Sequence, residues 1–531
     1  KKKKNKNKKA KKNKQEDKPI DDPLEINDEE LALLTSESTT SGPLEQTCAN
    51  ELESLFKFDP KIIDPSEEMK RNLGKAFSME NRSQESSRSG AKHRYGAKYV
   101  IPKMNWPPFR KAGYSMEISA KKGDITFYKY VHSNEYRQAE AMVKMAEDSG
   151  QFGFVYEVLN SNPYQLNALL LAAHAAQMQD DVSKSIEYIR WGIYGCESAS
   201  HALFNASSWK HRLSYSQFEN RAFFILLYKN ITYCEKRRSY MTALNFSKLL
   251  FSLEPEGDPL GMLLMMDTLA IKAKQFDWVK QVYDQLRTWK NPDFLPNWLY
   301  SSALVAFHTN DPSADEKLEH ALTAFPGIVV ALSQENQISF DRETESLRAL
   351  SHTSYMKETE AIRLLSTHYA KMSSALWKNE SVMVWLEQGV RRIGSDYGNR
   401  QIDKDMLKSR SIRFPSLSPQ MKRCIYLSDV NMPHESTTLT DPFPPKVSRG
   451  YDRSGPMSAA QVADENVLIR LLHSLYPDFD ENEPLAVDAG RIVNLVRDFF
   501  QGRRGDNGDQ VDQPQEEEDV EGLDHIHDQL D

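Results

Sequence analysis

Apolar side chains recur every three to four positions from residue 167 to residue 289, which is the period of a helix that buries one face. The pattern predicts helices over residues 167–178, 182–194, 220–233, 241–253, 259–273 and 276–289. Short polar segments separate them, so we expect antiparallel helical hairpins in series. The period weakens over 333–346 and resumes over 358–377 and 381–393.

Three prolines indicate a repeat length for these hairpins. Pro255, Pro292 and Pro326 lie 37 and 34 residues apart, near the 34-residue period of tetratricopeptide (TPR) arrays. Ala243 and Ala314 each precede such a proline by twelve residues, where a small side chain lets two helices approach closely. The full W-x2-L-G pattern is absent. The expected fold class is therefore all-α, an α-solenoid of degenerate TPR-like helical hairpins.

The stretch SLEPEGDPLGMLLMMD, residues 252–267, joins two of the predicted helices. Pro255 is expected to end the first helix, and Asp258 to cap the second, with Pro259 at its first position. The apolar run in this stretch is about half of the roughly 20 residues that cross a bilayer. We therefore predict that it is buried between helices, and we expect no membrane contact.

Composition divides the chain into six predicted parts. They are a basic, then acidic, mostly disordered region with short docking segments such as LESLFKF (1–97), an extended lead-in with a short strand at 124–132 (98–135), the solenoid (136–410), a proline-rich strap (411–456), C-terminal helices (457–502) and an acidic disordered tail (503–531). Because the sequence starts at Lys1 without a charged-then-apolar leader, we expect a piece of a longer protein with no secretory signal in view.

The two ends carry opposite charge, which the net charge of -8 hides. The first fourteen residues hold ten lysines: Lys1, Lys2, Lys3, Lys4, Lys6, Lys8, Lys9, Lys11, Lys12 and Lys14. One interpretation of this run is an electrostatic contact to nucleic-acid phosphate; the other is an import signal or solubilising tail. Without aromatic residues or arginine forks among the lysines, the run cannot read base sequence.

Sequence motifs for catalysis are missing. The chain has no GxxxxGK[ST], GxGxxG, GxSxG or HExxH segment, so we expect no enzyme, no catalytic residue and no cofactor. No metal site is expected either, because the four cysteines lie far apart: Cys48, Cys196, Cys234 and Cys424. His174 and His368 fall on apolar helices and are predicted to be hydrogen-bonded core residues.

Several strings in colinear order resemble one family: WPPFRKAGYSMEI, LNSNPYQLNALLLAA, RLSYSQFENRAFFILLYK, RRSYMTALNFSKLLFSLEPEGDPLGMLLMMD, SIRFPSLSP and DPFPP. They are similar to the transcription factor 25 family, also known as subunit one of the ribosome quality control complex. The resemblance spans residues 98–500 and is weakest over 333–358. The residues taken from these strings as structural family motifs are Trp106, Pro107, Asn220, Arg221, Pro255, Asp258 and Pro259.

The resemblance implies a non-enzymatic scaffold or adaptor. Such a protein would bind a Listerin-type E3 ubiquitin ligase, in its RING region, together with ubiquitin on the large ribosomal subunit. It would promote degradative ubiquitin chains on stalled nascent peptides and help recruit an AAA segregase. The expected localisation is cytoplasmic and ribosome-associated, and also nuclear. The older family name implies an alternative, a nuclear transcriptional repressor whose basic arm contacts nucleic acid.

Overall fold

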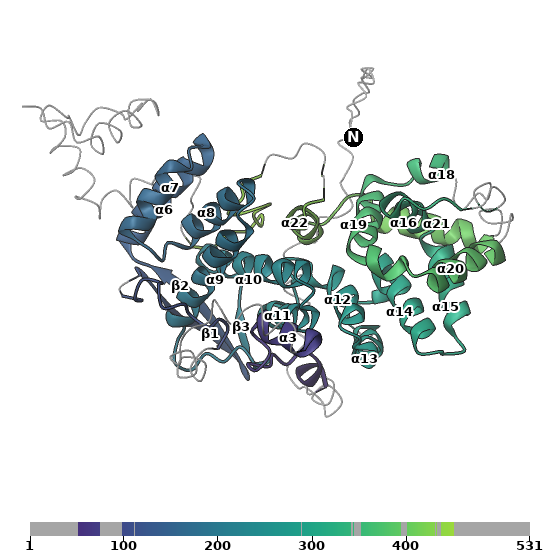
Figure 1. The fold of residues 1–531 in the computed structure, drawn as a ribbon, viewed down its shortest axis with the longest axis horizontal. Helices are drawn as coiled ribbons and strands as arrows, with labels where there is room; N and C mark the ends of the chain where they lie inside the picture. Colours follow the sequence, from purple (N-terminus) through teal and green to yellow (C-terminus); the bar gives the residue numbers. More distant parts are fainter. Residues whose placement is uncertain are drawn as a thin grey trace, which may run out of the picture. The chain divides into compact units, whose positions relative to one another are not determined.

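The structure is a computed structural model, and its described residues belong to the unit Lys1–Arg453 (Figure 1). It describes residues 51–74, 98–110, 112–287, 289–340, 344, 352–393, 401–430, 432 and 437–450. The lysine run, the predicted helices within 457–502 and the acidic tail lie outside the described residues.

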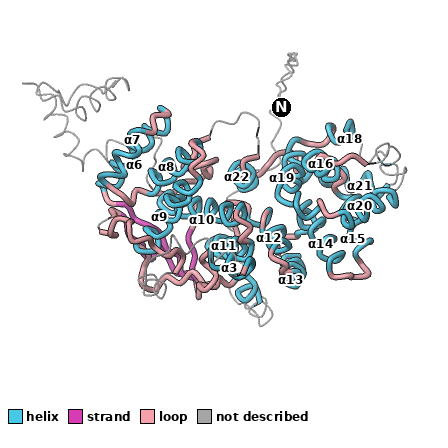
Figure 2. The backbone as a smooth tube through the Cα atoms, in the orientation of Figure 1, coloured by secondary structure: helices cyan, strands magenta, loops and turns pink. Residues whose placement is uncertain are grey.

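The described chain is mostly helical, with a small sheet near its start (Figure 2). Its first elements are α3 (Pro65–Leu73), β1 (Tyr114–Lys122), β2 (Ile125–His132), α6 (Asn134–Ser149), α7 (Gly153–Ser161), α8 (Leu166–Met178), α9 (Val182–Ser198), β3 (His211–Leu213), α10 (Phe218–Lys236) and α11 (Tyr240–Leu253). The next are η1 (Met262–Leu264), α12 (Met266–Lys272), α13 (Phe276–Arg287), η2 (Pro292–Phe294), α14 (Pro296–His308), α15 (Ala314–Ala324) and α16 (Gly327–Asn336). The last are α18 (His352–Met356), α19 (Glu360–Trp377), α20 (Glu380–Ile393), α21 (Gln401–Arg413) and α22 (Pro419–Leu427).

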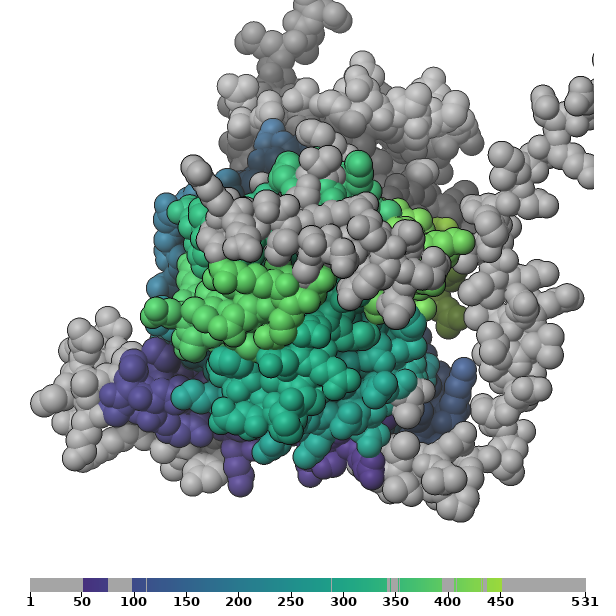
Figure 3. All heavy atoms as spheres, turned by 90° about the vertical axis from the view of Figure 1, so that its right-hand side faces the viewer, coloured from purple at the N-terminus to yellow at the C-terminus, as the bar shows by residue number. Residues whose placement is uncertain are grey.

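Helices that follow one another in the chain pack as hairpins, which confirms the predicted all-α, solenoid-like fold. The pairs α8 with α9, α10 with α11, and α14 with α15 are direct neighbours. The pair α16 and α19 continues the array across the segment where the sequence period weakens. At one end of the unit, α20 and α21 lie against α15 (Figure 3, green over teal).

A β-hairpin precedes the solenoid. The predicted strand is confirmed as β2, and β1 pairs with it antiparallel from Tyr114 opposite His132 to Lys122 opposite Ile125. β3 adds to β2 in parallel. At the start of β1, buried and exposed residues alternate, as the pleat of a half-buried strand requires. Two of these strands therefore lie inside the segment predicted as an extended lead-in with one short strand, and β3 comes from beyond it.

The joint between α11 and α12 differs from the prediction. Asp258 does act as a cap, since its carboxylate accepts hydrogen bonds from the backbone N of Met262 (2.7 Å) and of Leu263 (3.0 Å). However, Pro259 does not begin a helix, because Gly261 takes a left-handed backbone with φ +63° before η1. A Cβ at Gly261 would lie 2.9 Å from the Cβ of Cys424, so the close approach of α22 sets this turn.

The N-terminal segment 51–74 packs into the core through aromatic side chains and main-chain hydrogen bonds. Phe56 and Phe58 are each 1% exposed. On α11, the Asn245 side chain accepts from the backbone N of Asp59 and donates to its carbonyl oxygen, both at 2.9 Å. The Glu68 carboxylate accepts from the first backbone amides of α11. This part of region 1–97 is therefore integral to the folded unit.

Candidate interaction surface

The residues singled out by sequence split into a buried group and an exposed group. Arg221 belongs to the buried group, with 3% of its side chain exposed. Its guanidinium pairs with Asp441 at 2.5 Å and donates to Ser448 Oγ at 2.6 Å, both in the strap. It also donates to the carbonyl oxygens of Tyr215 (3.0 Å) and Ser216 (3.3 Å). Arg221 therefore ties α10 to a chain segment 220 residues away.

Asn220 also links α10 to other segments of the chain through its side chain. Its Oδ1 accepts from the backbone N of Tyr130 in β2 at 2.8 Å, and its Nδ2 donates to the Ser214 carbonyl at 2.9 Å. An asparagine side chain supplies both an acceptor and a donor, which is what two unpaired backbone groups need here. The Asn220–Arg221 pair thus holds the hairpin and the strap to one helix.

A second arginine links the joint to the strap. Arg423 on α22 donates through Nε to the Phe443 carbonyl (2.8 Å) and through Nη1 to the Pro259 carbonyl (2.9 Å). Its guanidinium also lies 4.7 Å from the ring centre of Tyr215. Pro255, Asp258 and Pro259 are buried in this region. We call this set of contacts, from Arg221, Arg423 and the strap, the clasp; it is a structural assembly rather than an open site.

Trp106 and Pro107 are structural as well. The Trp106 indole donates to the Glu187 carboxylate at 2.9 Å and stacks on Trp191, with the ring centres 6.4 Å apart. The Pro107 carbonyl accepts from the Tyr164 hydroxyl at 2.5 Å. These contacts hold the extended lead-in against α9 and the turn before α8.

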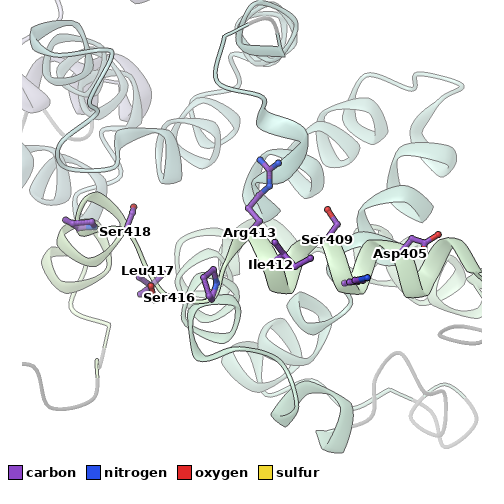
Figure 4. A pocket seen from close by; sticks show the side chains of 10 residues that line it. Asp405, Ser409, Ile412, Arg413, Ser416, Leu417 and Ser418 are labelled. Atoms are coloured by element: carbon purple, nitrogen blue, oxygen red, sulfur yellow. The ribbon is translucent and has the colours of Figure 1, made fainter. Parts of the chain in front are cut away.

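The string SIRFPSLSP, residues 411–419, lies on the surface. Its residues and the preceding turns of α21 line an open hollow of 780 Å³ (Figure 4). Asp405, Ser409 and Ile412 follow one another along one face of α21, and Ile412 is 68% exposed. Phe414 and Leu417 are buried and anchor the turn that follows. An exposed isoleucine in a family string is not explained by packing of this chain.

A buried ion pair fixes α21 from beneath this face. Arg410 pairs with Glu358 at 2.6 Å, with 5% and 8% of the two side chains exposed, and also donates to the Ala324 carbonyl. Arg413 lines both this hollow and a neighbouring one of 500 Å³ beside Phe294. The outward face, which carries Lys408, Ile412 and Arg413, was not predicted from sequence. The sequence feature that could have indicated it was an apolar side chain among cations in a segment without helical periodicity.

Burial disfavours the charged forms of two titratable groups in the interior, His368 and Cys424. Burial lowers the pKa of His368 to about 4, and its Nε2 lies 3.1 Å from Ser428 Oγ, so it is the hydrogen-bonded core residue that sequence predicted. Burial raises the pKa of the Cys424 thiol to about 12. His174 differs from the prediction, because it is only half-buried and makes a ring contact with Phe152.

Two searches of the described chain give negative results. Within the described ranges, no group of three or more His, Cys, Asp or Glu side chains is placed to hold a metal ion. Among the helices formed by these residues, none combines the length and the apolar character of a membrane span.

Comparison with known proteins agrees with the resemblance seen in the strings. The chain is 28% identical over 442 residues to "Ribosome quality control complex subunit TCF25" of Homo sapiens, covering 78% of this chain and 65% of the human protein. It is 23% identical over 312 residues to "Ribosome quality control complex subunit 1" of Schizosaccharomyces pombe, covering 58% and 47%. It is 26% identical over 281 residues to "Probable transcription factor claV" of Ampulloclitocybe clavipes, covering 49% and 36%.

The alignment spans less than two thirds of the length of the human relative. No solved structure matches the chain. The family model described as "Transcriptional repressor TCF25" matches residues 128–453, from β2 through the solenoid to the strap. Because this match covers more than half of the sequence, the resemblance is confirmed, and the chain belongs to the transcriptional repressor TCF25 family.

Proposed function

We propose that this protein is a non-enzymatic scaffold of ribosome-associated quality control, which holds a Listerin-type E3 ubiquitin ligase and ubiquitin in a fixed relation on the large ribosomal subunit. Two of the relatives described above are named as subunits of the ribosome quality control complex. Positioning alone lowers a reaction barrier by several kcal/mol, since it converts a loose encounter into an oriented one. A scaffold of this kind needs a rigid surface and no reactive group.

The observation that carries the proposal is the exposed face of α21 on a braced support. Ile412 projects from a helix that the Arg410–Glu358 ion pair anchors beneath it. An apolar side chain surrounded by charged ones, here Lys408 and Arg413, has the composition of an interface centre with a polar rim. We assign this face to the ligase, with the RING region as the expected contact.

A reconstituted reaction tests the scaffold proposal. It contains activating enzyme, conjugating enzyme, ubiquitin and the ligase, with and without this protein. Adding the protein should change the length or linkage of the ubiquitin chains, and omitting the ligase should leave it inert. Ubiquitin transfer by this chain without the ligase would refute the proposal, as would identical products with and without the chain.

The lysine run is proposed to add ribosome affinity through charge alone. Replacing Lys1 to Lys14 with glutamine at the ten lysine positions should weaken binding to large ribosomal subunits and flatten its salt dependence. Scrambling the order of the same residues should change neither property. If the glutamine form bound ribosomes as tightly as the parent at both low and high salt, the import-signal or solubilising interpretation would remain. Recruitment of the AAA segregase is tested separately, by its recovery with stalled ribosomes from cells that lack this protein.

The family description favours a second candidate, a nuclear transcriptional repressor whose basic arm contacts nucleic acid. The two candidates place the protein in different compartments and assemblies. Sedimentation of cell extracts should recover it with large ribosomal subunits in the cytoplasm if the first proposal is right. Recovery mainly with nuclear chromatin, and loss of that association on nuclease treatment, would favour the repressor.

A further inference from the structure

Three lysines on α10 and α19 gather around an aspartate that follows α22. In Figure 1, α22 lies between α10 and α19. Asp429 follows the end of α22 in a left-handed backbone with φ +57°. Its carboxylate lies 3.4 Å from Lys236 Nζ, and its backbone carbonyl accepts from Lys371 Nζ at 2.7 Å. The side chains of Lys236 and Asp429 are 65% and 53% exposed, so the group opens to solvent.

Lys229 is the least satisfied member of the group. It lies seven residues, or two helical turns, before Lys236 on the same side of α10. Burial lowers the pKa of Lys229, and the Asp429 carboxylate opposes that shift. Among the described residues, its ammonium group makes no hydrogen bond. His174 on α8 is within electrostatic reach of both Lys229 and Asp429 and, in the same part of the chain, also has no hydrogen-bond partner.

A buried polar network makes the floor of this group rigid. The Tyr228 hydroxyl lies 2.7 Å from Ser428 Oγ and donates to the Cys424 carbonyl at 3.0 Å. Ser428 in turn lies 3.1 Å from His368 Nε2. Tyr228 directly precedes Lys229 in sequence, and Ser428 directly precedes Asp429. His368 lies one helical turn before Lys371. The lysines are therefore presented from two helices, α10 and α19, and Asp429 from the turn that ends α22.

The charge of the group is unbalanced. Among the described residues, three ammonium groups gather around Asp429, and its carboxylate is the one acidic group that pairs with them, so positive charge is in excess there. Two described carboxylates in this region are engaged elsewhere: Glu235 pairs with Lys272 at 2.6 Å, and Glu147 accepts from the backbone N and the hydroxyl of Thr440. We propose that Lys229, Lys236 and Lys371 form a second phosphate-binding site, on the folded unit, for the backbone of RNA.

The side-chain types favour phosphate over a peptide carboxylate. Lysine ammonium groups bind phosphate as compact point charges, whereas planar carboxylates are best recognised by the fork of an arginine. The three side chains that converge on Asp429 are all lysines. They offer no base-reading geometry, so the site contacts phosphate without sequence preference. It is separate from the ligase-facing surface, and its test uses neither ribosome nor ligase.

The test measures the affinity of the full chain for a single-stranded RNA across a salt series. The variant Lys229→Gln, Lys236→Gln, Lys371→Gln removes the site. Each phosphate contact to single-stranded nucleic acid contributes about 0.7 to the slope of log affinity against log salt. Loss of three contacts should therefore reduce the slope by about 2 and weaken binding at moderate salt by about tenfold.

A matched control removes the same charge elsewhere. Lys103, Lys144 and Lys210 are surface lysines already paired with Glu187, Asp148 and Asp124. Their triple glutamine variant should keep the parent slope. Asp429→Asn removes the one counter-charge and should tighten RNA binding several-fold; asparagine tolerates the left-handed backbone there.

Two results would overturn the proposal. One is the same loss of slope in both triple variants, which would mean that net charge rather than this site sets affinity. The other result concerns a polyglutamate peptide of equal charge. If this peptide displaced the RNA from the parent chain, and if the triple lysine variant bound the peptide more weakly but bound the RNA as before, the three lysines would form an acidic-peptide surface. Circular dichroism of each variant excludes unfolding, and Lys371→Gln alone, at an exposed position, should show about a third of the slope change.

Discussion

The clasp gives a prediction whose size follows from its contacts. Arg221→Met removes the cation from a pair in which 3% and 12% of the side chains are exposed. Methionine fills most of the volume but leaves the Asp441 carboxylate, Ser448 Oγ and two carbonyl oxygens without their donor. Removing one partner of a buried ion pair costs about 3–5 kcal/mol. Because Asp441 keeps slight exposure, we expect a cost near the lower limit, about 3 kcal/mol.

Hydrogen exchange measures this cost where it acts. The backbone amides of Phe218 and Arg449 pair with the carbonyls of Arg449 and Ser216 across the strap, so they report its opening. A loss of about 3 kcal/mol should reduce their protection roughly a hundredfold. Amides of α14 and α15 lie away from the strap and should change little.

A double-mutant cycle separates the energy of the Arg221–Asp441 ion pair from the other effects of replacing Arg221. Asp441→Asn retains an acceptor for Arg221 and should cost about 1–2 kcal/mol, and the double variant should cost less than the two single costs combined. Arg392→Met is the matched control, because Arg392 pairs with Asp315 and Glu319 at the surface; it should cost at most about 1 kcal/mol. Equal hydrogen-exchange protection of the Phe218 and Arg449 amides in the Arg221 and Arg392 variants would refute the reasoning.

Three further predictions concern the joint, a buried acid and the α21 face. Asp258→Ala leaves the buried amides of Met262 and Leu263 without an acceptor and should cost about 2–4 kcal/mol, with Asp258→Asn costing less; Met265→Asp, at a fully buried position, should cost several kcal/mol. Equal, negligible melting shifts would show that the joint is exposed. Burial raises the pKa of the Glu254 carboxyl to about 7 in the folded protein. The protonated carboxyl therefore stabilises the fold below its usual pKa, and this stabilisation is lost as pH rises through 7. Glu254→Gln should therefore melt with a smaller change between about pH 5 and 8 than the parent, and an unchanged pH profile would contradict that burial. Ile412→Asp should shift stability by at most about 0.5 kcal/mol yet abolish the effect on ligase products, whereas unchanged products would remove α21 from the ligase contact.

Much of the helical pattern could be read from the chain, because a helix with one buried face repeats its apolar residues whatever its neighbours are. The predicted helix at 276–289 appears as α13 (Phe276–Arg287), and that at 241–253 as α11 (Tyr240–Leu253). The prediction of one helix over 259–273 was wrong at its start. Residues 262–266 are apolar at every position, so periodicity could not locate the first turn, and contact between Gly261 and Cys424 located it instead.

The role of the family strings depended on tertiary structure. Arg221 and Asp441 are 220 residues apart, and no local pattern connects them. Both lie in strings that sequence singled out, yet only the fold shows that they meet and are buried. The string around Ile412 mixes apolar, cationic and hydroxyl side chains, and only the fold shows that Ile412 is exposed while Phe414 and Leu417 are buried. Exposure is a property of what packs against a residue, which its own neighbours in sequence do not specify.

The amino-acid order was enough to establish a helical-repeat array and membership of a family, because both are carried by periodicity and by strings of neighbouring residues. It was also enough to identify charge runs, since charge is a sum over composition. The tertiary structure decided which charges act together. Lys229 and Lys236 come from α10, Lys371 from α19 and Asp429 from the turn after α22, and each is unremarkable in its own segment. Their convergence follows from helix packing alone, because packing brings distant segments within the few ångströms over which charges interact strongly.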